Sequence, residues 1–292
     1  MTDKIILGTV QFGLDYGIHN SSGKPSFDVV TNILTKAYQN NIRFLDSAEV
    51  YGNAHEIIGE FHKKHAARFG IVTKYSSSRK DLPEDLEARI LKNLETLQVK
   101  SLYAYMFHSF VDFENNYLAF QPKITRLKEK GLIGKFGVSV YTNEELAKLI
   151  GYAGIDIVQL PFNLLDNNFQ RGALIKEAKQ KGIEIHTRSA FLQGLFFEDL
   201  KKLSAKFSDL LPYLEEIKAL SENTGIDLST LALQYCVQQE MIDYVLIGVD
   251  NIEQLDKNID ALHRNIPKQT FYDVDSIKVE NLRMLNPSNW NK

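Results

Sequence analysis

Eight short apolar runs, separated by longer amphipathic stretches, are the feature that most restricts how this chain can fold. The runs are rich in β-branched and aromatic residues, and the stretches between them carry apolar residues at helical spacing, a pattern typical of consecutive βαβ units. We predict strands at Ile5–Gly8, Phe44–Asp46, Ile71–Lys74, Leu102–Phe107, Phe136–Val140, Ile157–Leu160, Ile183–Thr187 and Val245–Ile247. Eight parallel strands close a barrel, so the predicted fold is α/β, a (β/α)₈ TIM barrel.

The amphipathic stretches predict one helix after each strand and a further helix before the last strand. We predict helices at Val29–Gln39, Glu56–His62, Glu84–Leu97, Tyr117–Lys130, Asn143–Ile150, Gly172–Lys181, Leu214–Thr224, Leu228–Val237 and Ile252–Leu262. Gly131 and Gly182 follow lysine-rich last turns and predict left-handed helix caps. Between Leu195 and Leu211 the pattern thins, which we interpret as a mobile lid or substrate loop. The one cysteine, Cys236, is predicted to be a buried apolar residue.

Size and charge narrow the classes of function. One barrel accommodates 292 residues, so we predict a single domain over 1–292. The net charge of -3, with lysine and arginine spread along the chain, argues against nucleic-acid binding. No apolar stretch reaches the ~20 residues of a membrane span, and the chain begins directly with a strand, so we predict a cytoplasmic protein that binds neither membrane nor metal. A doubly wound sheet is disfavoured because no G-x-G-x-x-G motif follows the first strand.

Four polar residues lie at or just beyond the ends of the second, third and fourth predicted strands: Asp46, Tyr51, Lys74 and His108. In a barrel the carboxyl ends of the strands share one rim, so these side chains should converge. An ammonium beside a phenol lowers the pKa of the phenol, so we expect Lys74 to make Tyr51 a proton donor to a carbonyl oxygen. Asp46 would then hold Lys74, and His108 would orient the carbonyl. Taken singly, each residue is as readily a helix cap, a loop aromatic, a solvated strand end or a core histidine.

The stretch LDSAEVYGNAHEIIGE at 45–60 resembles the signature of the aldo-keto reductase family around its catalytic aspartate and tyrosine. LGTVQFG, IVTKY and MFHS resemble the first, third and fourth strands of that family in the same order. The resemblance implies reduction of an aldehyde or ketone by NADPH, with Tyr51 as the proton donor and Asp46, Lys74 and His108 as the other members of a tetrad.

Later segments resemble the nicotinamide dinucleotide site of the family. The implied cofactor-binding residues are Ser139, Gln159, Arg188, Ser189, Phe191, Gln193, Gly194, Gly248, Asn251, Gln254 and Asn258. Three positions depart from the family pattern. Val140 replaces a common asparagine, Arg188 replaces a tyrosine that stacks on the nicotinamide, and Asp250 stands where a group that binds the 2′-phosphate is common. We expect NADPH because the family favours it, with NADH as the alternative that Asp250 suggests.

Aromatic residues near the predicted rim suggest a substrate surface. The candidates are Phe12, Tyr16, Phe110, Phe162 and Trp290. We expect a small-molecule carbonyl substrate, and the segments RSAFLQG and LNPSNW resemble family members of carbohydrate pathways, which implies a sugar-derived carbonyl. Two alternatives stay open: a regulatory module that binds the cofactor with little turnover, and a dehydrogenase that works in the oxidative direction. The sequence leaves the oligomeric state open.

Overall fold

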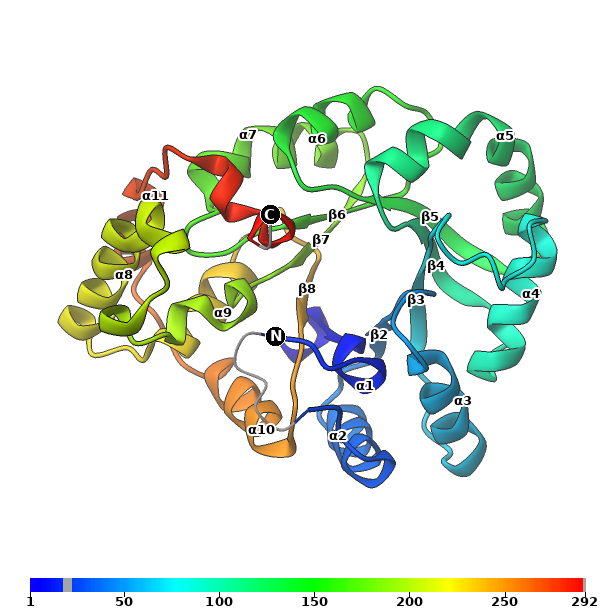
Figure 1. The fold of residues 1–292 in the computed structure, drawn as a ribbon, viewed down its shortest axis with the longest axis horizontal. Helices are drawn as coiled ribbons and strands as arrows, with labels where there is room; N and C mark the ends of the chain where they lie inside the picture. The colour runs from blue at the N-terminus through cyan, green and yellow to red at the C-terminus, as the bar shows by residue number, and fades with distance from the viewer. Residues whose placement is uncertain (18–22, 291–292) are drawn as a thin grey trace.

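The computed structural model describes residues 1–17 and 23–290 and contains a closed barrel of eight parallel strands in sequence order (Figure 1). The strands are β1 Ile5–Gly8, β2 Phe44–Asp46, β3 Gly70–Tyr75, β4 Leu102–Phe107, β5 Ile133–Ser139, β6 Ile157–Pro161, β7 Glu184–Arg188 and β8 Tyr244–Ile247. The pairing of β1 with β8, through Ile6 and Leu246, closes the sheet. The predicted TIM barrel is therefore confirmed.

Helices surround the barrel (Figure 1). They are α1 Val10–Gly13, α2 Phe27–Gln39, α3 Ala54–Lys64, α4 Leu86–Leu97, α5 Phe110–Glu129, α6 Asn143–Ile150, α7 Asn168–Gln180, α8 Leu211–Thr224, α9 Leu228–Val237, α10 Ile252–Ala261 and α11 Lys268–Ser276. Gly131 and Gly182 have φ of 68° and 78°, which confirms the predicted left-handed caps.

The structure differs from the sequence predictions in several places: α1 and α11 were not predicted, and two further segments differ clearly. Helix α5 begins at Phe110, seven residues before the predicted start at Tyr117, because the Ser109 side chain caps it by accepting a hydrogen bond from Asp112 N. The stretch predicted as a loop between Leu195 and Leu211 contains short 3₁₀ helices at Leu192–Phe197, Leu200–Lys202 and Ala205–Leu210, which bury Phe207 and Leu210.

Apolar residues fill the molecule in two places. Val72, Ala104, Met106 and Ile157 form a small cluster, and a larger one lies between the barrel and its helices. Cys236 is fully buried in the larger cluster, as predicted, and its thiol donates to the Phe162 carbonyl at 3.4 Å.

A polar cluster joins three strands at the end of the barrel where β4, β5 and β7 begin. Glu184 on β7 accepts a hydrogen bond from Tyr103 on β4 at 2.7 Å and forms an ion pair with Lys135 on β5. His186, two residues further along β7, contacts the same carboxylate at 2.7 Å.

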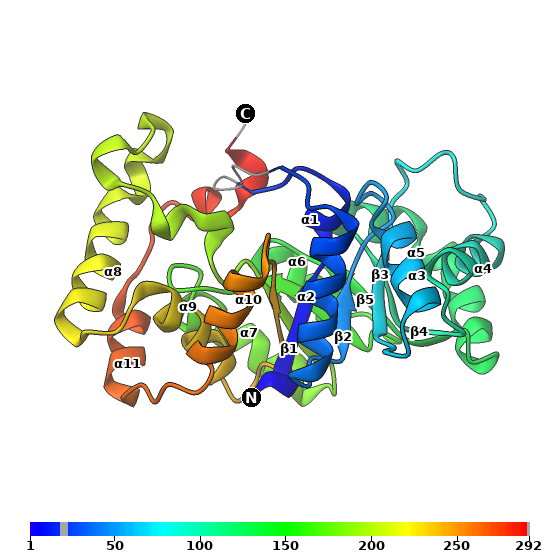
Figure 2. The same cartoon turned by 90° about the horizontal axis from the view of Figure 1, so that it is seen from below.

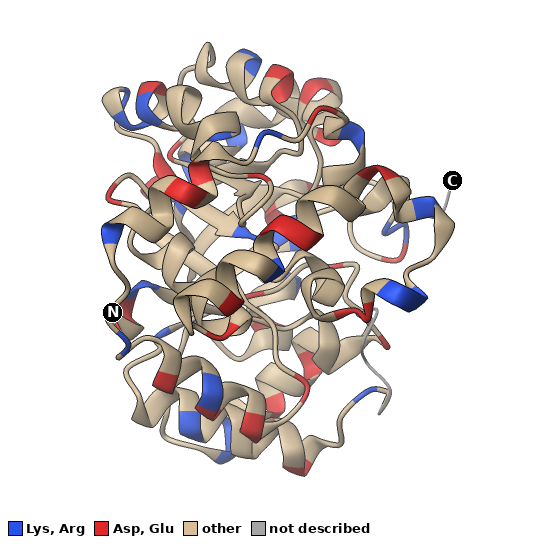
Figure 3. Ribbon diagram, turned by 90° about the vertical axis from the view of Figure 1, so that its left-hand side faces the viewer, with Lys and Arg blue, Asp and Glu red and all other residues tan. Residues whose placement is uncertain are grey.

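All strands run in one direction, so their carboxyl ends share a single rim, where α1 and the C-terminal segment also lie (Figure 2). Basic and acidic residues are interspersed over the face drawn in Figure 3. Within residues 1–17 and 23–290, no helix is both long and apolar enough to cross a membrane.

Candidate active site

A cavity of about 850 Å³ opens at the carboxyl-end rim of the barrel. Its walls come from the loops that follow most of the strands. The predicted site residues that line it are Tyr16, Asp46, Tyr51, His108, Ser139, Gln159, Arg188, Ser189, Phe191, Gln193, Gly194, Gly248, Gln254 and Asn258. The structure thus brings three of the four predicted catalytic residues to the wall of one cavity.

The fourth predicted catalytic residue, Lys74, lies beneath the cavity in a buried ion pair. Its Nζ is 2.5 Å from Asp46 Oδ1 and donates to the Ser47 carbonyl at 3.1 Å, and both charged side chains are almost fully buried. The second oxygen of Asp46 accepts from Gln159 Nε2 at 2.8 Å. Burial lowers the pKa of Lys74, whereas the neighbouring Asp46 carboxylate raises it. The predicted role of Asp46 in holding Lys74 matches the geometry.

Tyr51 lies beside His108 at the cavity, with ring centroids 5.6 Å apart and planes 82° from parallel. Burial and the Asp46 carboxylate raise the pKa of Tyr51 well above its usual value, and the Arg188 guanidinium opposes them. The prediction of a lowered pKa for Tyr51 is wrong, because burial and the Asp46 carboxylate dominate, while the Lys74 ammonium is directed to Asp46 and lies 5.5 Å from the centroid of the Tyr51 ring. The Tyr51 hydroxyl therefore stays protonated at neutral pH.

The pKa of His108 is lowered to about 3 by burial first, and then by the charges of Lys74 and Arg188. The imidazole is consequently neutral at physiological pH. A neutral imidazole can donate one hydrogen bond and accept another, which suits a residue that orients a carbonyl.

The loop that carries Tyr51 is held by the buried carboxylate of Glu49. Oε2 of Glu49 accepts from Arg89 Nε at 3.0 Å, and Oε1 accepts from Asn93 Nδ2 at 2.8 Å and from Tyr105 Oη at 2.7 Å. These partners anchor the loop after β2 to α4 and β4. Glu49 was not predicted as a site residue, although an acid between Ala48 and Val50, just before Tyr51, is a signal that it needs a buried partner.

The opposite end of the cavity is formed by the loop after β8 and the first turn of α10. Asn251 caps α10 by accepting from Gln254 N at 2.9 Å, so this predicted cofactor residue acts as a helix cap and does not line the cavity. Gln254 in turn accepts from Asp250 N at 2.8 Å. Within the described chain, the buried Oδ1 of Asp250 has no hydrogen-bond partner.

Two loops meet across the mouth of the cavity. Gln193 Nε2, after β7, donates to Tyr16 Oη, after β1, at 2.7 Å. Ser189, Leu192 and Gln193 all have positive φ, between 46° and 64°, which is unfavourable for residues with a side chain. The hydrogen bond joins the two loops into a bridge over the cavity.

Four of the five predicted substrate residues do not line the cavity. Phe12 is fully buried, and Phe110 is buried on α5. Phe162 stacks on Tyr235 at 5.4 Å, and Trp290 packs edge-on against Phe207. These four side chains stabilise the core and the loops, and only Tyr16 keeps its place in the proposed substrate site.

Several lining residues were not anticipated. Tyr141, after β5, contributes an aromatic wall, and Gln11, in α1, has a buried Oε1 without a hydrogen-bond partner among the described residues. A Cβ at Gly248 would lie 2.4 Å from Gln11 Nε2, so a larger residue at position 248 would displace the end of the Gln11 side chain. The sequence gives no distance between loops that are more than two hundred residues apart.

Comparison with known proteins gives a consistent result. The family model "Aldo/keto reductase family" matches residues 4–279. The chain is 25% identical over 250 residues to "Uncharacterized oxidoreductase YqkF" of Bacillus subtilis, covering 79% of this chain and 81% of that protein. It is 22% identical over 308 residues to the "NADH-specific methylglyoxal reductase" of Escherichia coli, covering 90% and 94%.

Among solved structures, the holo form of the aldo-keto reductase AKR11C1 from Bacillus halodurans matches with a TM-score of 0.73 and 18% identity, covering 96% of this chain and 95% of that one. The structural match supports the fold, while the family model spans nearly all of the sequence. The chain therefore belongs to the aldo/keto reductase family and is an NAD(P)H-dependent oxidoreductase that reduces carbonyl groups.

Proposed function

We propose that Tyr51 is the proton donor of the carbonyl reduction. The observation that carries the proposal is the buried Asp46–Lys74 pair beneath the cavity, 5.5 Å from the ring of a tyrosine that lines it. A protonated phenol gives up its proton when charge develops on a carbonyl oxygen, and a nearby ammonium stabilises the resulting phenolate. The raised pKa of Tyr51 keeps the proton in place until that moment.

Asp46, His108 and Glu49 then have separate supporting roles. Asp46 fixes the Lys74 ammonium and Gln159 through its two oxygens. Neutral His108 lies beside Tyr51 and hydrogen-bonds the carbonyl oxygen, which limits the positions that the substrate can take. Glu49 anchors the loop that carries Tyr51 to β4 and α4 through its hydrogen bonds.

The rest of the cavity fits a nicotinamide dinucleotide. Gln11 Oε1 and Asp250 Oδ1 are buried oxygens without hydrogen-bond partners in the described chain, and hydroxyl and amide groups of such a ligand would supply the donors. Residues proposed to hold it are Ser139, Gln159, Ser189, Phe191, Gln193, Gly194, Gly248, Gln254 and Asn258. When bound, the reduced nicotinamide supplies the hydride for the carbonyl carbon.

The choice between NADPH and NADH depends on the loop after β8. The family resemblance predicts NADPH, and Lys257 is a lining cation at this end that could meet a 2′-phosphate. Asp250 argues for NADH, because its carboxylate repels a phosphate and accepts a hydrogen bond from a ribose hydroxyl. We propose that the protein binds NADH at least as tightly as NADPH.

A sugar-derived carbonyl remains a prediction of the resemblance, and it has lost most of its aromatic support because only Tyr16 of the five candidate aromatics lines the cavity. The Asp46–Lys74 pair beside Tyr51 favours turnover over the regulatory alternative. The oxidative direction would use the same residues, with Tyr51 receiving the proton.

The test is a rate measurement with NADH and a simple aldehyde, with and without the substitution Tyr51→Phe. The loss of general acid catalysis should lower kcat by roughly 10²- to 10⁴-fold. The dissociation constant for NADH, followed by protein fluorescence, should change less than twofold. A variant with unchanged kcat would remove Tyr51 from the proposed role.

A further inference from the structure

Arg188, the last residue of β7, presents a positive charge to the catalytic part of the cavity. It lines the same cavity as Tyr51 and His108. None of the ion pairs among residues 1–17 and 23–290 involves Arg188. Within the part of the chain that the structure describes, its guanidinium donates two long hydrogen bonds, at 3.5 Å to Ser189 Oγ and at 3.3 Å to the Val140 carbonyl. A guanidinium has five donors, and most of those of Arg188 have no hydrogen-bond partner among the described residues.

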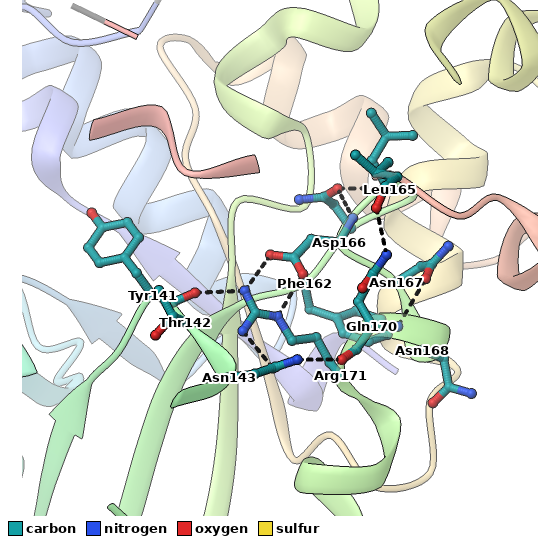
Figure 4. Close-up of polar contacts among 12 residues, drawn as sticks. Tyr141, Thr142, Asn143, Phe162, Leu165, Asp166, Asn167, Asn168, Gln170 and Arg171 are labelled. Carbon is teal, nitrogen blue, oxygen red and sulfur yellow. Dashed lines mark hydrogen bonds and ion pairs between the residues drawn. The ribbon is translucent and has the colours of Figure 1, made fainter. Parts of the chain in front are cut away.

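The guanidinium is held in a fixed position by Tyr141. The Cζ atom of Arg188 lies 4.0 Å from the centroid of the Tyr141 ring, which is a cation–π contact. The Tyr141 carbonyl accepts from Arg171 Nη2 at 2.7 Å, while Asp166 binds Arg171 through both carboxylate oxygens (Figure 4). In the same view the Tyr141 ring points away from this network (Figure 4). The Arg188 guanidinium therefore packs on the ring of a residue whose backbone is held by Arg171 and, through Arg171, by Asp166.

The carboxylates near Arg188 are already bound to other groups. Burial raises the pKa of Asp166, an effect that the charge of Arg188 opposes, and Asp166 binds Arg171 through both of its oxygens. Asp46 is the carboxylate that lines this end of the cavity, and both of its oxygens are bound to Lys74 and Gln159. Arg188 lowers the pKa of Lys74 and contributes to the low pKa of His108, so its field reaches the reacting groups. The other lining carboxylates, Asp227 and Asp250, belong to the loops before α9 and α10.

We propose that Arg188 is a specificity-determining residue that binds a carboxylate carried by the substrate, so that the preferred substrates are oxo acids or acid semialdehydes. The inference rests on the proposed function, because the carbonyl must lie at Tyr51 while the carboxylate lies at Arg188. A planar guanidinium matches the two oxygens of a carboxylate, and a single free cation balances its single charge. The carboxylate is unchanged by the reaction, in which the carbonyl carbon gains a hydride and its oxygen gains a proton.

The experiment uses two pairs of probes that differ in charge but little in shape: 4-carboxybenzaldehyde against 4-nitrobenzaldehyde, and succinic semialdehyde against butanal. The variants are Arg188→Gln and Arg188→Lys, each measured with NADH. For Arg188→Gln we expect kcat/KM to fall roughly ten- to hundredfold on the charged probes, mainly through KM, and less than threefold on the neutral probes. Arg188→Lys should recover part of the loss on the charged probes.

The control is Lys257→Gln, which removes another lining cation at the far end of the cavity and should leave the ratio of charged to neutral activity unchanged. Equal losses of Arg188→Gln on both kinds of probe, accompanied by weaker NADH binding, would assign Arg188 to the cofactor and overturn the proposal. An unchanged kcat/KM on the charged probes would overturn it as well. Activity of the wild-type protein on the neutral probes, and its loss in Tyr51→Phe, tests the proposed function separately.

Discussion

Asp250 shows how one side chain can set the choice of cofactor. The carboxylate lines the cavity at the start of α10, its backbone N–H is bound to Gln254, and its Oδ1 lacks a hydrogen-bond partner within the described chain. An unpartnered acceptor in a half-buried position is costly unless a ligand supplies a donor. Its charge and its free oxygen both favour a ribose hydroxyl over a phosphate.

The substitution Asp250→Asn should therefore raise the affinity for NADPH relative to NADH. Loss of a charge close to the 2′-phosphate is worth about 1 kcal/mol in a partly exposed site, which corresponds to a change of roughly fivefold in the ratio of the two dissociation constants. Isothermal titration with each cofactor measures the ratio. Glu253→Gln, an exposed acid in the same turn that does not line the cavity, is the matched control. A ratio that moves equally in both variants would show that Asp250 has no special position.

At the residue scale, the sequence predicts the chemistry of the site better than its electrostatics. The pairing of Asp46 with Lys74 follows from their positions at the ends of adjacent strands. The pKa of Tyr51 does not follow, because it depends on the burial of the ring and on the nearby Asp46 carboxylate. The approach of Arg188 to Tyr141 likewise depends on two loops that are distant in the sequence.

At the scale of single elements, two helix ends illustrate the free-energy cost of a residue in the left-handed backbone conformation. Helix α4 ends at Gln98 with φ of 57°, and α5 is followed by Gly131 with φ of 68°. Both ends need the same backbone conformation, but only Gly131 adopts it without a steric penalty. Nothing lies within 4 Å of a Cβ built at Gly131, so a substitution there changes the backbone energy alone.

Two reciprocal substitutions test this cost. Gly131→Ala should destabilise the protein by about 1 kcal/mol, and Gln98→Gly should stabilise it by roughly 0.5–1 kcal/mol, since the exposed Gln98 side chain contributes little. Midpoints of thermal unfolding should move in opposite directions by roughly 2 °C. Shifts of the same sign in both variants would contradict the assigned helix ends.

The start of α5 explains why element boundaries are harder to predict than elements. Phe110, Phe113 and Tyr117 have helical spacing, but the intervening Asp112, Asn115 and Asn116 favour turns in isolation. In the fold the aromatic residues are buried, with the tilted rings of Phe113 and Tyr117 4.7 Å apart between centroids, and the packing outweighs the weak local propensity.

At the scale of the whole molecule, the Glu184 cluster links three strands and makes the stability of the barrel depend on pH. Burial alone would raise the pKa of Glu184, but its hydrogen bonds with His186, Lys135 and Tyr103 lower it to about 2, against an ordinary value of 4.5. A carboxyl with a depressed pKa in the folded state stabilises that state above pH ~4.5 and loses the contribution as the pH falls towards 2.

Acid unfolding of Glu184→Gln should therefore depend less steeply on pH between 4.5 and 2 than that of the wild-type protein. The difference should reach up to about 3 kcal/mol over this range. Urea unfolding at several pH values gives the slopes. Asp81→Asn is the matched control, because Asp81 also has a pKa of about 2 through its partner Arg79 but is fully exposed, where ion pairs contribute little. Equal slopes for the wild-type protein and Glu184→Gln would exclude a role for the cluster.

The barrel itself could be predicted from the sequence because all eight strand runs have the length and composition of buried parallel strands. The predicted single domain over 1–292 stays a prediction. The cavity could not be predicted, since its walls come from loops whose mutual positions are set by the closed sheet. The residues Phe12, Phe110, Phe162 and Trp290 were therefore assigned to a substrate site that they do not line.

Cys236 has a practical consequence for measuring the stability of this enzyme. It is the one thiol in the sequence, it is fully buried, and burial raises its pKa far above the range in which a thiolate forms. A thiol-reactive dye can therefore label the chain only in molecules that have opened enough to expose α9. The rate of labelling therefore measures how often the protein opens. Cys236 can report unfolding without an engineered probe.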